Sequence, residues 1–291
     1  MKKSVSLFLY GSILFLLIPY VFAVLLNGSQ LVFADRQLDV EKILPIVLAA
    51  EISEEYEVET IKAQAVIARS NLYRRIKEGE NMLSLLGELP RETYGSKFQN
   101  LMSQKRGKNE GIYYFQMLKL YESAAKETEG MVLSWENRLV HVPYHQMSSG
   151  KTRDGAEVFH SDEYKYLVSV NSDVDKKAEE YLCGKYVLKR QMPRELVIAG
   201  RDSAGYVTEL QADGKTIEGE TFREGLSLPS SSFTIQVIED KMRFLCRGKG
   251  HGLGFSQYGG NEMARQGSTY MEILAYYFPK MQLGNIDELL M

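Results

Sequence analysis

The chain has 291 residues, a formal net charge of −3 and an apolar fraction of 44%, which is ordinary for a globular protein. This length allows one or two domains. The slightly negative charge lacks the basic footprint of a nucleic-acid-binding protein, so we expect no nucleic acid among its partners. The two cysteines, Cys183 and Cys246, are too few for a disulfide framework, and their spacing does not indicate whether they pair.

A long apolar segment lies close to the N-terminus. Residues 5–26 contain no charged side chain and follow Lys2 and Lys3. About 20 apolar residues span a bilayer, and basic residues stay on its cytoplasmic side. We therefore expect an uncleaved membrane anchor whose C-terminal remainder faces outward. The competing interpretation is a signal peptide cleaved after Ala23, but the apolar run continues beyond that position.

Two helices are expected in the first half of the remaining chain. Residues 38–50 are rich in apolar side chains and fit either a strand or a helix. Residues 58–76 carry apolar side chains at steps of three and four, which predicts a helix, and Ser53 supplies a plausible start. Residues 82–109 are polar and predict a surface excursion. The spacing in 111–129 is again helical.

The second half reads mainly as short strands. Residues 131–144 alternate apolar and polar side chains around a turn at 136–137, which predicts a strand pair. We expect another strand at 166–170, several in 206–244, and a closing helix at 269–278. Helix, strands, helix and more strands in this order indicate an α+β fold instead of repeating βαβ units.

The segment 247–267, RGKGHGLGFSQYGGNEMARQG, has the most unusual composition of the chain. Glycine at alternate positions lets a backbone approach a ligand closely and weakens an ordinary strand. We expect a loop or bent strand that presents His251, Ser256, Gln257 and Tyr258. The alternative is a glycine-rich turn with a buried histidine. The pattern is not the glycine fingerprint of a dinucleotide site.

This segment and three others resemble the stage II sporulation protein D family, in the family's order. They are ETIKAQAVIARS at 59–70, YHQMSSGKT at 144–152, the weaker LSLPSSSF at 226–233, and GHGLGFSQYGGNEMARQG followed by 270–279. The resemblance covers roughly residues 40 to 279. It implies a lytic transglycosylase that cleaves peptidoglycan glycan strands to 1,6-anhydro products during endospore engulfment. It also implies two partners, stage II sporulation proteins P and M.

The resemblance implies that Glu59 is the catalytic acid. Its position alone indicates only a surface acid in the first turn of a helix. One carboxyl that serves as acid and then as base needs a pKa near the working pH, so we expect a desolvated cleft. Glu51 and Glu55 are the nearest alternatives, and we interpret both as structural or solvated. Gln64 is expected to bind sugar or to lie on the helix surface, and Arg69 to form a structural ion pair.

The resemblance also places a polar turn in the substrate cleft. This turn contains Ser148, Ser149, Lys151 and Thr152, and the cleft is completed by His251, Ser256, Gln257 and Tyr258. Family members usually carry two glycines in the turn, and here Lys151 occupies the second place. Some relatives bind zinc with cysteines and histidines near His141 and His145. Because this chain has no cysteine before Cys183, we expect no metal and no cofactor.

The expected organisation is a membrane-anchored enzyme with its catalytic domain on the extracytoplasmic side. It comprises a cytoplasmic tail at 1–4, the anchor at 5–26, a tether at 27–37, one α+β catalytic domain with a cleft at 38–284, and a C-terminal tail at 285–291. Two alternatives stay open. One is a glycan-binding module without turnover, and the other is a zinc-dependent cell-wall hydrolase that uses the histidines.

Overall fold

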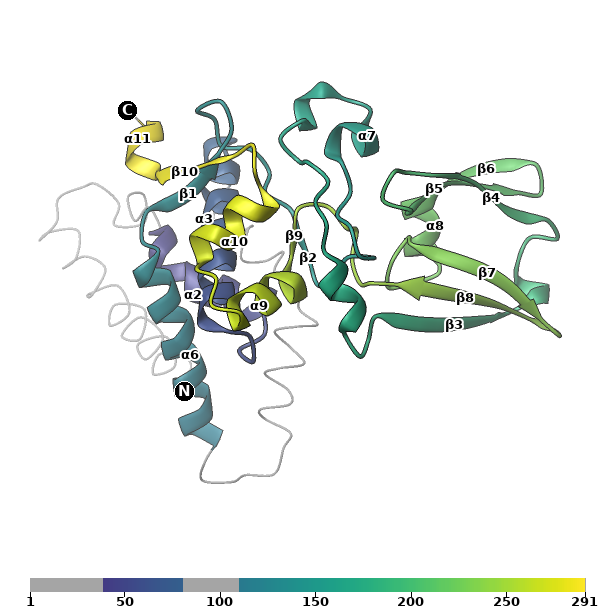
Figure 1. Ribbon diagram of the computed structural model, residues 1–291, viewed down its shortest axis with the longest axis horizontal. Coiled ribbons are helices and arrows are strands. Elements are labelled where there is room, and N and C mark those ends of the chain that lie inside the picture. Colours follow the sequence, from purple (N-terminus) through teal and green to yellow (C-terminus); the bar gives the residue numbers. More distant parts are fainter. Residues whose placement is uncertain (1–38, 81–109, 291) are drawn as a thin grey trace, which may run out of the picture.

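The computed structural model describes residues 39–80 and 110–290. The expected membrane anchor at 5–26, the tether at 27–37 and the surface excursion at 82–109 lie outside these residues. Within the described part, no helix is long and apolar enough to cross a membrane. Helices gather at one end of the molecule and two three-stranded sheets lie at the other, as expected for a mixed α+β architecture (Figure 1).

Three helices form the first part of the fold: α2 (Val40–Glu51), α3 (Val58–Lys77) and α6 (Glu110–Glu127). The segment at 38–50 is therefore helical, and the side chain of Asp39 caps its start by accepting a hydrogen bond from the Glu41 amide. The prediction that the 58–76 pattern forms a helix is confirmed.

The predicted start of α3 at Ser53 is wrong, because the helix begins five residues later. The Ser53 hydroxyl accepts a hydrogen bond from the Glu55 amide at 3.3 Å, and the Ser53 carbonyl accepts one from the Tyr56 amide at 3.4 Å. These local bonds form a turn between the two helices, and such bonds compete with helix formation. Glu57 takes the N-cap position instead.

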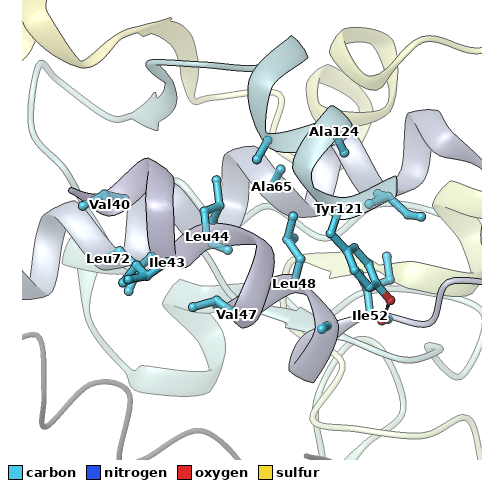
Figure 2. Close-up of a cluster of buried hydrophobic side chains, with 14 of the residues drawn as sticks. Val40, Ile43, Leu44, Val47, Leu48, Ile52, Ala65, Leu72, Tyr121 and Ala124 are labelled. Atoms are coloured by element: carbon cyan, nitrogen blue, oxygen red, sulfur yellow. Dashed lines mark hydrogen bonds between the residues drawn. The ribbon is translucent and has the colours of Figure 1, made fainter. Parts of the chain in front are cut away.

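Helix α3 lies at the centre of the helical part and contacts α2, α6, β1, α9 and α10. One face packs into a cluster of apolar side chains with α2 and α6, where the Tyr121 hydroxyl donates a 2.8 Å hydrogen bond to the Ile52 carbonyl (Figure 2). The other face buries Ala63, Val66 and Ile67 in a second cluster. Because both faces are buried, α3 fixes the elements on either side of it.

Strand β1 (Met131–Ser134) pairs antiparallel with β10 (Gln282–Asn285), far away in sequence. The predicted strand pair around 136–137 reduces to one bridge between Trp135 and Arg138, so that part of the prediction is wrong. The reason lies in Asn71 of α3. Its side chain donates to the Val142 carbonyl at 2.8 Å and accepts from the Val142 amide at 2.9 Å, which satisfies the backbone in place of a strand.

The predicted strand at 166–170 is absent from the described structure, where these residues form turns and extended loop. Their backbone groups bond to another loop instead. The Leu167 carbonyl accepts from the Gly155 amide at 2.8 Å, and the Val170 carbonyl accepts from the Thr152 amide at 2.9 Å. The short helices here are α7 (Gly155–Phe159) and two 3-10 turns (Asp162–Tyr164 and Asp173–Lys177).

The strands expected in 206–244 belong to two antiparallel sheets. One has the order β3 (Leu182–Leu188), β8 (Lys241–Arg247), β7 (Phe233–Ile238), and the other has the order β4 (Leu196–Arg201), β5 (Val207–Ala212), β6 (Lys215–Glu218). A 3-10 turn (Lys189–Gln191) follows β3, and helix α8 (Gly219–Gly225), which the strand patterns did not predict, follows β6. The rings of Phe222, Phe233 and Phe244 pack between these elements at centroid distances of 5.7 to 5.8 Å.

A short parallel pair joins the two ends of the molecule: β2 (Tyr144–His145) and β9 (Phe255–Ser256). Helix α9 (Gln257–Arg265) starts directly after β9. The closing helix is confirmed as α10 (Tyr270–Tyr277), with a capping box between Thr269 and Glu272. The chain then enters β10 and α11 (Ile286–Leu290).

Candidate active site

The pairing of β2 with β9 brings the serine turn and the glycine-rich segment together. Residues 248–254 form a loop that leads into β9, as expected for the first half of the segment. The loop or bent strand expected across 247–267 is wrong for the second half, because Gln257 and Tyr258 begin helix α9, which the Ser256 side chain caps. Gly248, Gly250, Gly252 and Gly254 all have positive φ. A Cβ at Gly254 would overlap the Pro143 carbonyl, and one at Gly248 would overlap the Ser148 carbonyl. Glycine is therefore required for the close approach of the two backbones.

Helices α2, α3 and α9 converge on the side chain of Glu51, the last residue of α2. The Gln64 amide donates a 2.8 Å hydrogen bond to the Glu51 carboxyl group. The Gln257 amide donates to the Glu51 backbone carbonyl at 2.9 Å and to the Gln64 side-chain oxygen at 3.3 Å. The Tyr144 hydroxyl of β2 also hydrogen-bonds to the Glu51 carboxyl group. Two predicted site residues, Gln64 and Gln257, thus meet at an acid that sequence reasoning had set aside.

Burial raises the pKa of Glu51 to about 7, although its hydrogen bonds to Gln64 and Tyr144 act in the opposite direction. Its position at the C-terminus of α2 also disfavours the charged form. The residue as a whole keeps part of its surface exposed. Burial, followed by the Glu51 charge, raises the pKa of Tyr144 as well. Burial therefore holds the pKa of the Glu51 carboxyl group near neutrality.

Glu59 lies in the first turn of α3, as expected, but its carboxyl group contacts structural partners. One oxygen accepts a 2.7 Å hydrogen bond from the Lys62 ammonium, and the other accepts one from the Tyr270 amide at the start of α10, also at 2.7 Å. Lys62 in turn pairs with Glu127 of α6 at 2.6 Å. These contacts tie α3 to α6 and α10. Glu55 lies in the turn before α3 and is exposed.

A buried carboxylate, Asp175, joins the serine turn to the start of α9. The Ser148 amide donates to it at 2.6 Å, and the Ser256 hydroxyl donates to its two oxygens at 2.9 and 3.1 Å. The Ser256 hydroxyl also caps α9 by accepting from the Gly259 amide at 3.2 Å. Burial raises the pKa of Asp175, and the hydrogen bonds from Ser148, Ser256 and Ser172 oppose that shift. Ser148 and Ser256 therefore act through Asp175, which fixes the serine turn relative to the start of α9.

The other members of the serine turn have different surroundings. The Ser149 amide donates to the Tyr206 hydroxyl at 2.9 Å, which links the turn to the sheets. Thr152 is buried, and its hydroxyl accepts from the Val170 amide at 2.8 Å. Lys151 is exposed. Tyr258 is partly buried, and its amide donates to the Gln146 carbonyl at 2.9 Å.

Two histidines lie beside the glycine-rich loop. The rings of His145 and His251 have centroids 5.8 Å apart. His145 Nδ1 lies 3.0 Å from the Leu253 carbonyl, which can only accept, so Nδ1 carries the proton and the buried Nε2 is an acceptor without a partner among the described residues. His251 Nδ1 accepts from the Leu253 amide at 3.1 Å. Burial lowers the pKa of His145 to about 3 and also lowers that of His251.

His141 lies on the same segment as His145 but is exposed. The residues that the structure describes contain no group of three or more histidine, cysteine, aspartate or glutamate side chains arranged to hold a metal ion.

Sequence reasoning missed Asp175 and Tyr206 and undervalued Glu51. Asp175 stands in a polar stretch that reads as solvated loop, and Tyr206 begins an ordinary strand pattern. No local signal distinguishes them, because their partners lie 27 and 57 residues away in sequence. Glu51 had a usable signal. It follows an apolar helical run, and an acid at the end of such a run is poorly placed for the helix dipole.

Comparison with known proteins links the chain to one family. A family model described as stage II sporulation protein matches residues 32–135. Stage II sporulation protein D of Bacillus amyloliquefaciens is 30% identical over 88% of this chain and 77% of its own length, and the protein of the same name from Bacillus subtilis (strain 168) gives the same values. An uncharacterized protein of Brachyspira hyodysenteriae is 25% identical over 92% of this chain and 70% of its own length.

Proposed function

The chain belongs to the stage II sporulation protein D family, and on this premise we propose that it is a lytic transglycosylase of peptidoglycan glycan strands. The acid and base is Glu51. One observation carries this assignment: the Glu51 carboxyl group is held by Gln64 and Tyr144 where burial raises its pKa to about 7. An acid that must give up a proton and then take one works best with a pKa near the working pH.

The proposed reaction uses the same carboxyl group twice. Protonated Glu51 donates its proton to the oxygen of the glycosidic bond as that bond to C1 breaks. The resulting carboxylate then accepts the proton of the sugar's own C6 hydroxyl while the C6 oxygen attacks C1. The product carries a 1,6-anhydro ring, and Glu51 is protonated again. Water takes no part, so a second carboxylate is not needed, in contrast to ordinary glycosidases.

The neighbouring carboxylate is poorly suited to activate water. Asp175 is fully buried, and both of its oxygens accept hydrogen bonds, from the Ser148 amide and the Ser256 hydroxyl. These bonds support the proposal of a single acid and base. They also give Asp175 a positioning role, since it holds the start of α9 where Gln257 meets Glu51.

The sequence-based choice of acid, Glu59, stays a prediction that competes with Glu51. Each oxygen of Glu59 already accepts a hydrogen bond, from Lys62 and from the Tyr270 amide. A general acid must present a carboxyl oxygen to the glycosidic oxygen that it protonates, and both oxygens of Glu59 are occupied by protein partners. We therefore propose a structural role for Glu59 and the catalytic role for Glu51.

The substrate contacts that we propose are those of the sequence prediction, and they divide into two groups. Tyr258 keeps part of its surface exposed and Lys151 is exposed, so these two would bind sugar groups. Gln64 and Gln257 are buried and their amides bond to Glu51, so they belong with the residues that shape the cleft. Ser148, Ser149, Thr152, His251 and Ser256 already use hydrogen bonds within the protein and would shape the cleft. The proposed setting is the outer face of the cell membrane during engulfment, with an anchor at 5–26 and stage II sporulation proteins P and M as partners.

The decisive experiment is product analysis with the full chain in detergent. Purified glycan strands are incubated with the wild type and with Glu51→Gln, Glu59→Gln and Glu55→Gln, and the products are identified by mass spectrometry. We expect 1,6-anhydro ends from the wild type, Glu59→Gln and Glu55→Gln, and none from Glu51→Gln. Loss of activity in Glu59→Gln with a folded, active Glu51→Gln would return the acid role to Glu59. Reducing ends in place of anhydro ends would identify a hydrolase.

A further inference from the structure

The two cysteines lie opposite each other on neighbouring strands. In the antiparallel pairing of β3 with β8, Cys183 is the register partner of Cys246. Residues directly opposite each other project from the same face of a sheet. Cys246 belongs to the apolar cluster between the two sheets, whereas Cys183, on the edge strand, is exposed. The sequence spacing of the two cysteines gave no sign of this arrangement.

The hydrogen bonds between β3 and β8 show which kind of cross-strand pair the two cysteines form. The Gly248 amide donates a 2.8 Å hydrogen bond to the Tyr181 carbonyl, and the Arg247 amide bonds in the other direction, to the Ser232 carbonyl beyond β7. Hydrogen-bonded pairs alternate along an antiparallel ladder. Cys183 and Cys246, two residues further along each strand, therefore form the next hydrogen-bonded pair between β3 and β8.

A disulfide between these cysteines requires strands β3 and β8 to move closer together. Cα atoms of a hydrogen-bonded pair are about 5.5 Å apart, inside the range of about 4.4–6.8 Å that disulfides span. The Cβ atoms of a hydrogen-bonded pair lie toward the far end of the range of about 4.5–5.5 Å, whereas a disulfide prefers about 3.5–4.5 Å, so the strands must approach by about 1 Å. Among the described residues, strand β3 pairs on one side only, with β8, which leaves it room to approach β8. The strain left over makes such a bond easier to reduce.

We propose that Cys183 and Cys246 form a reversible intramolecular disulfide that fastens the edge strand β3 to β8 beside the serine turn. The proposal rests on strand register and not on the proposed reaction. The disulfide would link the first residues of β3 to the last residues of β8. This is the end of the sheet that lies next to the serine turn.

The chemistry requires a disulfide oxidant, for which oxidised glutathione serves. The exposed Cys183 thiolate attacks one sulfur of the oxidant and releases one glutathione thiolate. The Cys246 thiolate then attacks the Cys183 sulfur of this mixed disulfide and releases the second. Two protein thiols are oxidised and one glutathione disulfide is reduced to two thiols. Burial raises the pKa of Cys246 to about 11, so the second step accelerates as the pH rises.

Both strands of the pair lead directly to the serine turn. The Tyr181 hydroxyl, two residues before Cys183, donates a 2.9 Å hydrogen bond to the Ser149 carbonyl. On the other strand, the Lys249 amide donates to the Met147 carbonyl at 2.8 Å. A covalent link between β3 and β8 therefore holds two segments that position the turn.

The test is oxidation of the purified full chain in detergent with oxidised glutathione, followed by non-reducing peptide mapping. We expect one peptide pair joined through Cys183 and Cys246, loss of both free thiols, and a melting temperature above that of the reduced protein. Dithiothreitol should open the bond without denaturant. The rate of cross-linking should rise with pH.

Variants separate the outcomes. Cys183→Ser, an exposed and conservative change, should leave the melting temperature unaffected by oxidant, and Cys246→Ala should acquire a stable glutathione adduct on Cys183. A wild type that carries only a glutathione adduct on Cys183, or that forms dimers through Cys183, would overturn the proposal. An oxidised wild type with an unchanged melting temperature would refute the fastening of β3.

Discussion

The side-chain amide of Gln64 donates a 2.8 Å hydrogen bond to the carboxyl group of Glu51. This hydrogen bond joins the end of α2 to α3. The side-chain amide of Gln257, on α9, donates a second hydrogen bond to the Gln64 side-chain oxygen at 3.3 Å. A polar group that bonds to the charged form of an acid lowers its pKa, and burial raises it. The first two predictions follow from the balance between burial and hydrogen bonding at the Glu51 carboxyl group.

Gln64→Leu should shift the pH dependence of glycan cleavage. The hydrogen bond from Gln64 lowers the pKa of Glu51, so its removal raises that pKa above about 7. Because the protonated form starts the reaction, the falling limb of kcat/KM should move to higher pH. The measurement is a pH profile of anhydro-product release. Lys77→Met, at the far end of the same helix, is the control and should leave the limb in place. If the falling limb stays in place in Gln64→Leu, the group that titrates in the pH profile is not Glu51.

The free energy of unfolding should depend on pH through Glu51. Its pKa is raised from 4.5 to about 7 in the folded state, so the folded protein binds the proton more tightly. The stability from this group is complete below about pH 4.5 and is lost as the pH rises through about 7, by roughly 3 kcal/mol. Glu51→Gln should remove this loss. Urea titrations of both proteins at pH 5 and pH 8 measure the difference, and parallel losses would contradict the prediction.

Arg69→Met should destabilise the helical part strongly. Arg69 is fully buried, and its guanidinium donates to both Glu41 oxygens at 2.6 and 2.9 Å and to the Ala125 carbonyl at 2.9 Å. The variant leaves a carboxylate without its partner, which costs about 3–5 kcal/mol for a buried pair. The matched control is Arg74→Met, which breaks the more exposed Arg74–Glu78 pair on the same helix and should cost about 0.5 kcal/mol. The measurement is urea unfolding, and equal unfolding midpoints for Arg69→Met and Arg74→Met would contradict the predicted difference in stability.

Gly254→Ala should disturb the junction between β2 and β9. Gly254 has a φ of 67°, and an added Cβ would overlap the Pro143 carbonyl. The left-handed conformation alone costs a residue with a Cβ about 1–2 kcal/mol, and the overlap adds to that cost. We expect a lower melting temperature and loss of glycan cleavage. Gly225→Ala is the control, because nothing lies near its added Cβ and its φ is not positive. Equal effects of the two substitutions would contradict the proposed constraint.

Glycan cleavage should survive exhaustive treatment with a chelator. The proposed proton transfers use only the carboxyl group of Glu51, and no step assigns chemistry to His141 or His145. The measurement is anhydro-product release before and after EDTA, together with elemental analysis of the purified chain. Activity that is lost on chelation and restored by zinc would favour the zinc-dependent hydrolase instead.

Local patterns were sufficient for α3, α6 and α10. The apolar spacing in 58–76 predicts α3 correctly, and the segment 269–278 is correctly expected to be the closing helix α10, because helical contacts lie within four residues. The family resemblance likewise follows from sequence alone, and so does the pairing of Arg69 in an ion pair. Strand partners were less accessible, since β1 pairs with β10 about 150 residues away and the 166–170 segment bonds to a loop.

The choice among acids required the tertiary structure. By sequence, Glu51, Glu55 and Glu59 are neighbours, and helix position alone favours none of them as a catalyst. The fold gives each a different environment. It surrounds the Glu51 carboxyl group with Gln64 and Tyr144, places Glu59 between Lys62 and the α10 amide, and leaves Glu55 in solvent. The pKa of a carboxyl group depends on burial and on neighbouring dipoles and charges, and these come from segments up to about 200 residues apart. The sequence alone therefore identifies the three candidate acids, whereas only the fold decides the burial and the hydrogen bonds that set the pKa of each carboxyl group.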